Sequence, residues 1–178
     1  ALQADGWYVR NQAIWWKPNA MPESVKDRLT VDYESLYLLT KSPRYYFDAA
    51  AIAEPAIKGA AGSRFDAGKT GTNGMGRVST APRVERETRN RRTVWRIPTE
   101  ALRDEHYAPM PEALVEPCIL AGSRPGDTVL DPFAGSGTVL RVAERFGRHG
   151  VGIDLNSDYI AMSERRTNGV QVHMEAML

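Results

Sequence analysis

The sequence is poor in the residues that form disulfides and metal centres. It contains one cysteine, Cys118, which excludes an internal disulfide and a cysteine-based zinc site. Its three histidines, His106, His149 and His173, have no paired-ligand spacing. No hydrophobic run approaches the ~18 residues of a membrane-spanning helix. We therefore expect no metal site and no membrane association, and we expect Cys118, among apolar and prolyl neighbours, to be a buried structural thiol.

The first residues lack the features of a natural amino terminus. The chain begins Ala1-Leu2-Gln3, with no initiator methionine, no basic leader and no apolar signal segment. We therefore expect an internal piece of a longer protein. The composition, 42% hydrophobic and 25% charged residues over 178 residues, is that of one globular domain with a substantial core.

Positive charge is concentrated in the middle of the chain. Residues 58–96 hold ten basic residues, eight of them arginine, against three acidic ones, a net charge of +7. The rest of the chain has 13 basic and 19 acidic residues, a net charge of −6. An arginine-rich segment in an otherwise acidic chain is typical of contact with a polyanion, because the guanidinium fork matches phosphate. A solvated basic loop explains the charge alone equally well.

Three regions follow one another along the chain. Residues 1–54 contain two strand-like stretches, 12–16 and 33–39, on either side of a turn-rich segment. Residues 55–92 are rich in glycine and have no hydrophobic period, which predicts a long loop. From residue 93 onward the pattern alternates between strand and helix.

The third region predicts a parallel α/β unit. Helical spacing covers residues 111–121, where Pro117 should kink or shorten the helix. A short strand at 128–130 is followed by a glycine-rich loop and by a helix with apolar residues at 139, 142, 143 and 146. A second strand at 150–154 precedes a last helix that Asn156 or Ser157 can cap. Strand, loop, helix and strand in this order imply a right-handed crossover, with ligands at the carboxyl ends of the strands.

The glycine-rich loop predicts a nucleoside site. Gly135 and Gly137 permit positive φ angles and close approach of a ligand to the backbone, and the next helix presents free N–H groups. Asp154 stands 17 positions after Gly137, at the end of the second strand, where a carboxylate can accept hydrogen bonds from the hydroxyls of a ribose. A purely structural turn is the alternative interpretation.

Two other nucleotide motifs fit poorly. The dinucleotide fingerprint requires Gly or Ala three positions after the second glycine, and this chain has Leu140 there, which disfavours a nicotinamide or flavin cofactor. The stretch from Gly62 to Gly68-Lys69-Thr70 suggests a phosphate-binding P-loop. Its glycines are separated by five residues instead of four, and no strand precedes them.

Longer runs of sequence resemble one family. The segments "HYAPMP" (106–111), "VLDPFAGSGT" (129–138) and "GVGIDLNSDYI" (150–160) closely resemble the carboxyl-terminal part of S-adenosylmethionine-dependent DNA amino-methyltransferases. These enzymes methylate the exocyclic amine of adenine (N6) or cytosine (N4). The run "WWKPNAMPESVKDRLTVDYESLYLLTKSPRYYFD" (15–48) resembles the region after the catalytic motif in the permuted β order of the family.

The resemblance implies a fold and an organisation. The fold is a three-layer, Rossmann-like α/β methyltransferase fold with a mostly parallel sheet, truncated at its amino terminus. Residues 1–54 would be the remainder of the catalytic half, residues 55–92 a target-recognition segment, and residues 93–178 the cofactor-binding half. The implied partner is double-stranded DNA with a flipped target base, and no membrane is implied. The implied location is the cytoplasm of a prokaryotic or phage-infected cell. The chain could also form a homodimer.

The resemblance also implies site residues. The S-adenosylmethionine site would consist of His106, Ala108, Asp131, Phe133, Ala134, Gly135, Ser136, Gly137, Thr138 and Asp154. The DNA contacts would come from Arg83, Arg86, Arg89, Arg91 and Arg92. Each has a plainer interpretation, as a core residue, a satisfied loop residue or a surface ion pair.

One departure from the family bears on activity. Its members hold the target amine with Asp, Asn or Ser followed by Pro-Pro and an aromatic residue, and this chain has no Pro-Pro pair. In the permuted order that motif would precede residue 1, so we expect a truncated methyltransferase that is inactive alone and whose catalytic residues lie upstream. The alternative is a non-catalytic DNA-binding or accessory protein with a degenerate methyltransferase fold. A small-molecule methyltransferase is disfavoured by the permuted order and the arginine-rich insert.

Overall fold

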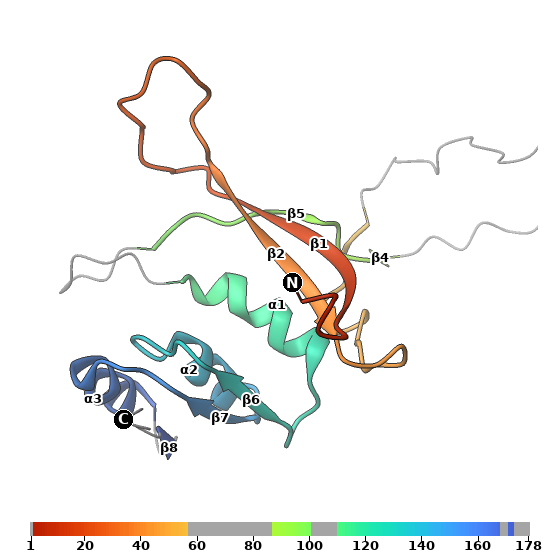
Figure 1. Ribbon diagram of the computed structural model, residues 1–178. Coiled ribbons are helices and arrows are strands. Elements are labelled where there is room, and N and C mark those ends of the chain that lie inside the picture. Colours follow the sequence, from red (N-terminus) through yellow and green to blue (C-terminus); the bar gives the residue numbers. More distant parts are fainter. Residues whose placement is uncertain (1, 57–86, 101–109, 168–170, 173–178) are drawn as a thin grey trace, which may run out of the picture.

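The computed structural model describes residues 2–56, 87–100, 110–167 and 171–172 (Figure 1). Its strands form two separate three-stranded sheets and one two-stranded ladder. Helix α1 (Glu112–Gly122) lies between the two sheets. In the described residues no helix is long and apolar enough to cross a membrane.

The amino-terminal sheet is a hairpin with one added strand. Strand β1 (Tyr8–Trp16) pairs antiparallel with β2 (Tyr33–Thr40) and parallel with β5 (Val94–Arg96), in the order β2-β1-β5. These strands are rich in aromatic and branched residues, which favour extended backbone. Side chains alternate between the two faces. Trp15 therefore turns toward α1 and is buried, whereas Trp16 points to the other face and is exposed.

The carboxyl-terminal sheet is fully parallel. Strands β6 (Thr128–Asp131), β7 (His149–Gly152) and β8 (Gln171–Val172) stand in the order β6-β7-β8. Helix α2 (Thr138–Arg145) connects β6 to β7, and helix α3 (Ser157–Arg166) follows β7. Consecutive parallel strands joined by a helix confirm the predicted crossover.

Helix α1 joins the two sheets through opposite sides of its surface. Leu114 packs with Trp15 and Ile97 of the amino-terminal half. Val115 and Ile119 pack in a second cluster with Val142 and Ala143 of α2. Each half therefore has its own small core, and α1 contributes to both.

Arg148 fixes the ends of two helices to each other. Its side chain donates to the Ser123 carbonyl at 2.7 Å and to Ser123 Oγ at 3.2 Å, beyond the last turn of α1. It also donates to the Phe146 carbonyl at 2.5 Å, beyond α2. Arg148 is only 8% exposed, and a buried cation is stabilised there by carbonyls at the negative ends of the helix dipoles.

A short ladder pairs the residues on either side of segment 57–86. Strand β3 (Glu54–Pro55) runs antiparallel to β4 (Thr88–Arg89). Glu54 Oε1 accepts hydrogen bonds from Arg89 Nε at 2.9 Å and from Arg92 Nε at 3.1 Å. One carboxylate thus holds both ends of the segment together.

The structure confirms most of the predicted elements and corrects two details. Three predicted strands, at 12–16, 33–39 and 128–130, fall within β1, β2 and β6. The side chain of Asn156 caps α3, because it accepts a hydrogen bond from Asp158 N at 2.9 Å. Strand β7 ends at Gly152, two residues before Asp154. The described strands form two sheets instead of one continuous sheet.

For α1, the structure contradicts the shortening expected at Pro117 and the burial expected for Cys118. Pro117 does not shorten the helix, which runs for 11 residues through it. The carbonyl that Pro117 leaves without an amide partner belongs to the exposed Ala113, where water can bond it. Cys118 is exposed and not buried, because Leu114 and Ile119 take the core positions and Cys118 faces a groove.

Candidate cofactor site

The loop between β6 and α2 lies at the carboxyl edge of the parallel sheet. It turns immediately after β6, and Asp131 Oδ1 accepts a hydrogen bond from Phe133 N at 3.0 Å. Gly135 has φ +51°, and Gly137, the N-cap of α2, has φ +81°. Both angles favour glycine, so the two predicted glycines are required by the backbone.

Asp154 ties this loop to the neighbouring strand. Its Oδ2 accepts from Gly135 N at 2.8 Å, and its Oδ1 accepts from Asn156 N at 2.8 Å. The two amides fix the orientation of the carboxylate without using all of its lone pairs, because each oxygen can accept two hydrogen bonds. Asp154 therefore keeps acceptor capacity for a ligand.

The loop leaves room for a ligand against its backbone. A Cβ built on Gly135 would meet only one atom within 4 Å, the carbonyl oxygen of Phe133 at 4.0 Å. Phe133 of the loop and Leu155, which follows Asp154 in the sequence, are large apolar side chains that are each 87% exposed. The first amides of α2 add donors with no partner within the helix. The exposed apolar side chains suit a base, the Asp154 carboxylate suits the two hydroxyls of a sugar, and the amides of α2 suit a polar tail.

Tight packing supports the loop from behind. A Cβ on Gly137 would lie 2.2 Å from Ser163 Oγ, so only glycine fits between the loop and α3. Arg166 Nη1 donates to the Ser136 carbonyl at 2.8 Å. Helix α3 thereby holds the loop at two consecutive positions.

The structure brings most of the predicted cofactor residues together. One turn holds seven of them: Asp131, Phe133, Ala134, Gly135, Ser136, Gly137 and Thr138. The eighth, Asp154, is joined to this turn by its hydrogen bond with Gly135 N. Ala134 and Thr138 are buried and support the turn. His106 and Ala108 lie outside the described residues, as do Arg83 and Arg86.

The three described arginines of the predicted DNA surface have partners within the chain. Arg89 and Arg92 form ion pairs with Glu54 through Nε. Arg91 lies 4.8 Å from the centroid of the Trp95 ring. The side chain of Arg92 is nevertheless 66% exposed.

Sequence reasoning missed three residues of the site: Leu155, Ser163 and Arg166. Leu155 follows the predicted acid directly, but exposure cannot be read from one position. Ser163 and Arg166 contact the loop across about 30 positions of sequence, at the i and i+3 spacing of one helix face. A serine and an arginine at that spacing give no local signal of such a contact.

Comparisons with known proteins agree with this geometry. Residues 1–165 match the DNA methylase family of N6- and N4-methyltransferases. Type II methyltransferase M.Cfr9I of Citrobacter freundii is 44% identical over 169 residues, which are 95% of this chain and 47% of that protein. The chain spans about half the length of the curated relatives it matches.

Two solved structures share the fold. PvuII DNA methyltransferase, which is cytosine-N4-specific, superposes with a TM-score of 0.65 at 18% identity, over 96% of this chain and 55% of that one. A complex of M1.HpyAVI with SAM superposes with a TM-score of 0.62 at 21% identity, over 94% and 66%. The predicted Rossmann-like α/β class is confirmed.

Proposed function

Because the chain belongs to the DNA methylase family, we propose that it forms the S-adenosylmethionine-binding body of a site-specific DNA amino-methyltransferase. The loop between β6 and α2 binds the cofactor together with Asp154. The methyl acceptor is the exocyclic amine of adenine (N6) or cytosine (N4) in double-stranded DNA. M.Cfr9I, a Type II methyltransferase, supports this assignment.

The hydrogen bond from Gly135 N to Asp154 is the observation that carries the proposal. It presents a carboxylate with free lone pairs next to an open glycine backbone, which is what a ribose with two hydroxyls requires. The exposed Phe133 and Leu155 give the adenine ring apolar surfaces. The amides at the start of α2 suit the carboxylate of the methionine part.

The cofactor supplies a methyl group activated by a sulfonium. The residues of this chain bind and orient it and exclude water on one side, so their contribution to rate is positioning and desolvation. The sequence contains no Asp, Asn or Ser followed by Pro-Pro and an aromatic residue. The proposal therefore assigns cofactor binding to this chain and assigns none of its residues to holding the target amine.

The arginine-rich middle of the chain would contact DNA. Its charge bias favours phosphate, and the exposed side chain of Arg92 is available beside the ladder. Arg83, Arg86, Arg89 and Arg91 belong to the same segment. Extrusion of the target base from the duplex follows from the chemistry, since an exocyclic amine inside a base pair is out of reach of the cofactor. We place the protein in the bacterial cytoplasm, where DNA and cofactor meet.

Calorimetry tests the cofactor assignment. S-adenosylmethionine is titrated into the wild-type chain, Asp154→Ala and Asp158→Ala, which removes an exposed carboxylate at the start of α3. We expect Asp154→Ala to weaken binding at least tenfold and Asp158→Ala to leave it unchanged. Far-UV circular dichroism checks that all three are folded. Equal binding by the wild type and Asp154→Ala, or no binding by a folded wild type, would refute the assignment.

A further inference from the structure

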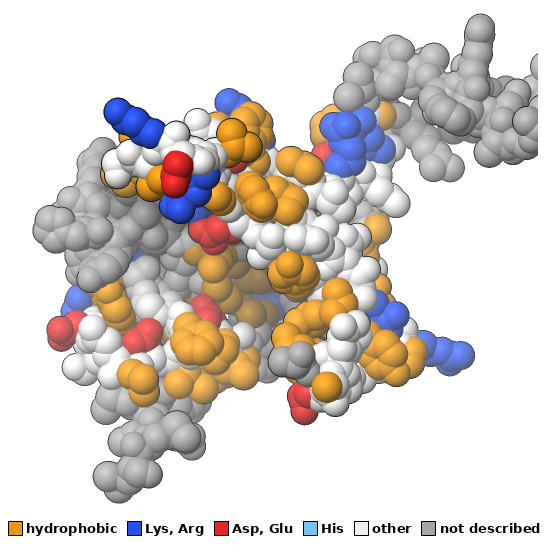
Figure 2. Space-filling model, turned by 45° about the horizontal axis from the view of Figure 1, so that its top comes forward, with side chains coloured by type: hydrophobic (Ala, Val, Ile, Leu, Met, Phe, Trp, Pro, Cys, Tyr) orange, Lys and Arg blue, Asp and Glu red, His pale blue; other side chains and the backbone are white. Residues whose placement is uncertain are grey.

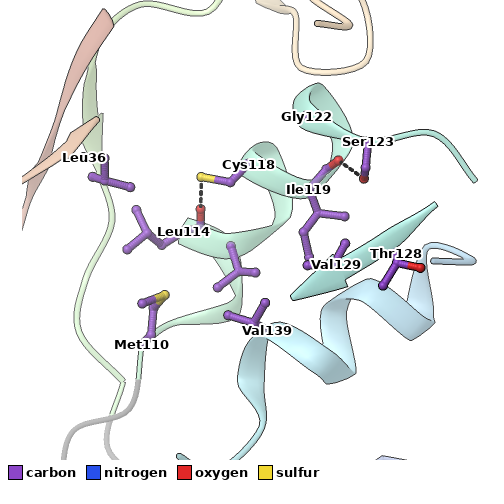
Figure 3. A pocket seen from close by; sticks show the side chains of 11 residues that line it. Leu36, Met110, Leu114, Cys118, Ile119, Gly122, Ser123, Thr128, Val129 and Val139 are labelled. Carbon is purple, nitrogen blue, oxygen red and sulfur yellow. Dashed lines mark hydrogen bonds between the residues drawn. The ribbon is translucent and has the colours of Figure 1, made fainter. Parts of the chain in front are cut away.

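The groove that Cys118 faces and a second hollow flank α1, and each has a volume of about 340 Å³. Among the described residues, the lining of the groove includes no charged side chain (Figure 3). The second hollow is lined by Arg91, by Glu116 of α1 and by residues 51–53, which lead into β3. Charged side chains that the cofactor site does not use therefore lie beside the β3–β4 ladder.

Arg91, in the middle of the run 89–92, is turned toward the core of the amino-terminal half. Its guanidinium carbon lies 4.8 Å from the centroid of the Trp95 ring, and Trp95 packs against the core around Trp15. Its Nε is buried without a hydrogen-bond partner among the described residues. Arg91 therefore anchors the run by packing, which leaves contact with a charged ligand to Arg89 and Arg92.

Glu54 holds both of these arginines through a single oxygen atom. Its Oε1 accepts a hydrogen bond from Arg89 Nε at 2.9 Å and another from Arg92 Nε at 3.1 Å. Both hydrogen bonds use Nε, and among the described residues no hydrogen bond reaches an Nη atom of either arginine. Two guanidiniums bonded to one oxygen are neighbours, so their outer donors lie close together and are free for a ligand.

The backbone at both arginines is fixed as well. Arg89 stands directly opposite Glu54 in the ladder, and the carbonyl of Arg92 accepts a hydrogen bond from Trp95 Nε1 at 2.6 Å. The side chains still reach solvent, since that of Arg89 is 30% exposed and that of Arg92 is 66% exposed. Figure 2 shows a compact group of basic side chains at the upper right of the molecule. Each arginine thus has reduced rotamer freedom in the free protein and remains accessible.

We propose that Glu54 is a positioning residue that presents Arg89 and Arg92 as a paired clamp for one backbone phosphate of duplex DNA. Guanidinium donors match the oxygens of a phosphate in geometry and charge. Two cations share one carboxylate, so the clamp keeps a net positive charge. The carboxylate orders both side chains before DNA arrives, and this ordering would otherwise weaken binding. A phosphate contact sets the register of the protein on DNA and does not read its sequence.

Glu54→Ala separates positioning from plain electrostatics by the direction of its effect. Removing a carboxylate adds net positive charge, which by itself strengthens binding to DNA. Because two arginines lose their order, we expect Glu54→Ala instead to weaken binding about fivefold. Glu54→Gln removes the same charge but keeps an acceptor oxygen, and it should bind at least as tightly as the wild type.

Glu87→Ala is a matched control beside β4. Glu87 is exposed, and its side chain has no hydrogen bond or ion pair among the described residues. Its removal changes the charge near the ladder without releasing an arginine, so binding should stay the same or become tighter. Binding of a fluorescein-labelled duplex to the full chain is measured by fluorescence anisotropy over a series of salt concentrations. Circular dichroism checks that each variant is folded.

A double variant shows whether Glu54 acts through the arginines. Arg89→Gln with Arg92→Gln should reduce the slope of log K against log salt by about 0.9, the value for one phosphate. On that background Glu54→Ala should cause no further loss of binding, whereas a merely structural role would weaken binding there too. Should Glu54→Ala not fold, Arg92→Lys replaces it in the test. Lysine keeps the cation but lacks the Nε that Glu54 orients, so binding should again weaken.

The proposal rests on the proposed function, and the two can fail separately. Unchanged or tighter binding by folded Glu54→Ala would overturn the clamp, as would equal losses from Glu54→Ala with and without the two arginines. A folded wild-type chain that binds no duplex at low salt would contradict the DNA partner and the clamp together. Duplex binding that follows the expected pattern, in a chain that fails to bind S-adenosylmethionine in calorimetry, would contradict the cofactor assignment and support the clamp.

Discussion

Replacing Gly137 by alanine tests whether the glycine loop is held against α3. The new Cβ would lie 2.2 Å from Ser163 Oγ and 2.9 Å from Ser163 Cβ, and the backbone φ is +81°. The left-handed backbone costs a residue with a Cβ about 1–2 kcal/mol. Overpacking of a tight site costs a further ~1–3 kcal/mol. We therefore expect Gly137→Ala to lower the free energy of unfolding by about 2–5 kcal/mol.

Gly126 provides a matched control. Its φ is +86°, but a Cβ there would meet no atom within 4 Å. Gly126→Ala should therefore lower the free energy of unfolding only by the cost of the left-handed backbone, about 1–2 kcal/mol. The difference between the two variants measures the clash with Ser163. Urea denaturation followed by circular dichroism gives both values.

A second substitution separates the clash from the backbone strain. Ser163 Oγ is buried and has no hydrogen-bond partner among the described residues. Ser163→Ala alone should leave stability unchanged or raise it, since an unpaired buried hydroxyl costs about 1–3 kcal/mol. In the double variant with Gly137→Ala part of the loss should be recovered. Equal costs for Gly137→Ala and Gly126→Ala, or no coupling in the double variant, would refute the tight contact between the loop and α3.

The helix ends and the groove give two more predictions. Arg148→Met should destabilise the chain by about 2–4 kcal/mol in urea denaturation, because it removes three hydrogen bonds at the ends of α1 and α2. Arg145 is 45% exposed, and Arg145→Met removes its ion pairs to Glu112 and Glu116 and its contact with the Phe146 ring. This variant should cost less than ~1 kcal/mol, and a similar loss in both variants would contradict this role of Arg148. The apolar groove around the Cys118 thiol desolvates it and raises its pKa, and the Arg91 charge lowers this pKa by less. A raised pKa keeps the thiol protonated to higher pH, so the maleimide rate should still be rising above pH 9, and a plateau below pH 9 would contradict the shift.

The cofactor loop could be predicted from sequence because its signals are local. Two glycines after an apolar strand, and an acid after the next strand, fix the turn and its partner within 25 positions. The structure adds the hydrogen bond between Gly135 N and Asp154, which the sequence analysis did not predict. Local signals also limited the cap of α3 to Asn156 or Ser157, since a capping side chain bonds an amide two positions away, and the structure selects Asn156.

Features that depend on distant contacts could not be predicted. The exposure of Cys118 depends on which strands flank α1, and the sequence around it is apolar in either case. The ion pairs of Arg89 and Arg92 with Glu54, 35 and 38 positions away, could not be predicted from the charge of the segment. Composition gives the sign of a segment's charge but not the neighbours of its arginines.

Leu140 shows how a departure from a motif is compensated elsewhere. The dinucleotide fingerprint places a small residue at this position of the helix so that helix and strand can approach closely. Here the helix has leucine, fully buried, and the small residues are on the strand. A Cβ on Gly152 would lie 2.6 Å from Leu140 Cδ1, and one on Gly150 would lie 3.2 Å from Leu140 Cα. The close approach of helix and strand is thus preserved in this chain, because Gly150 and Gly152 of β7 supply the space that Leu140 occupies.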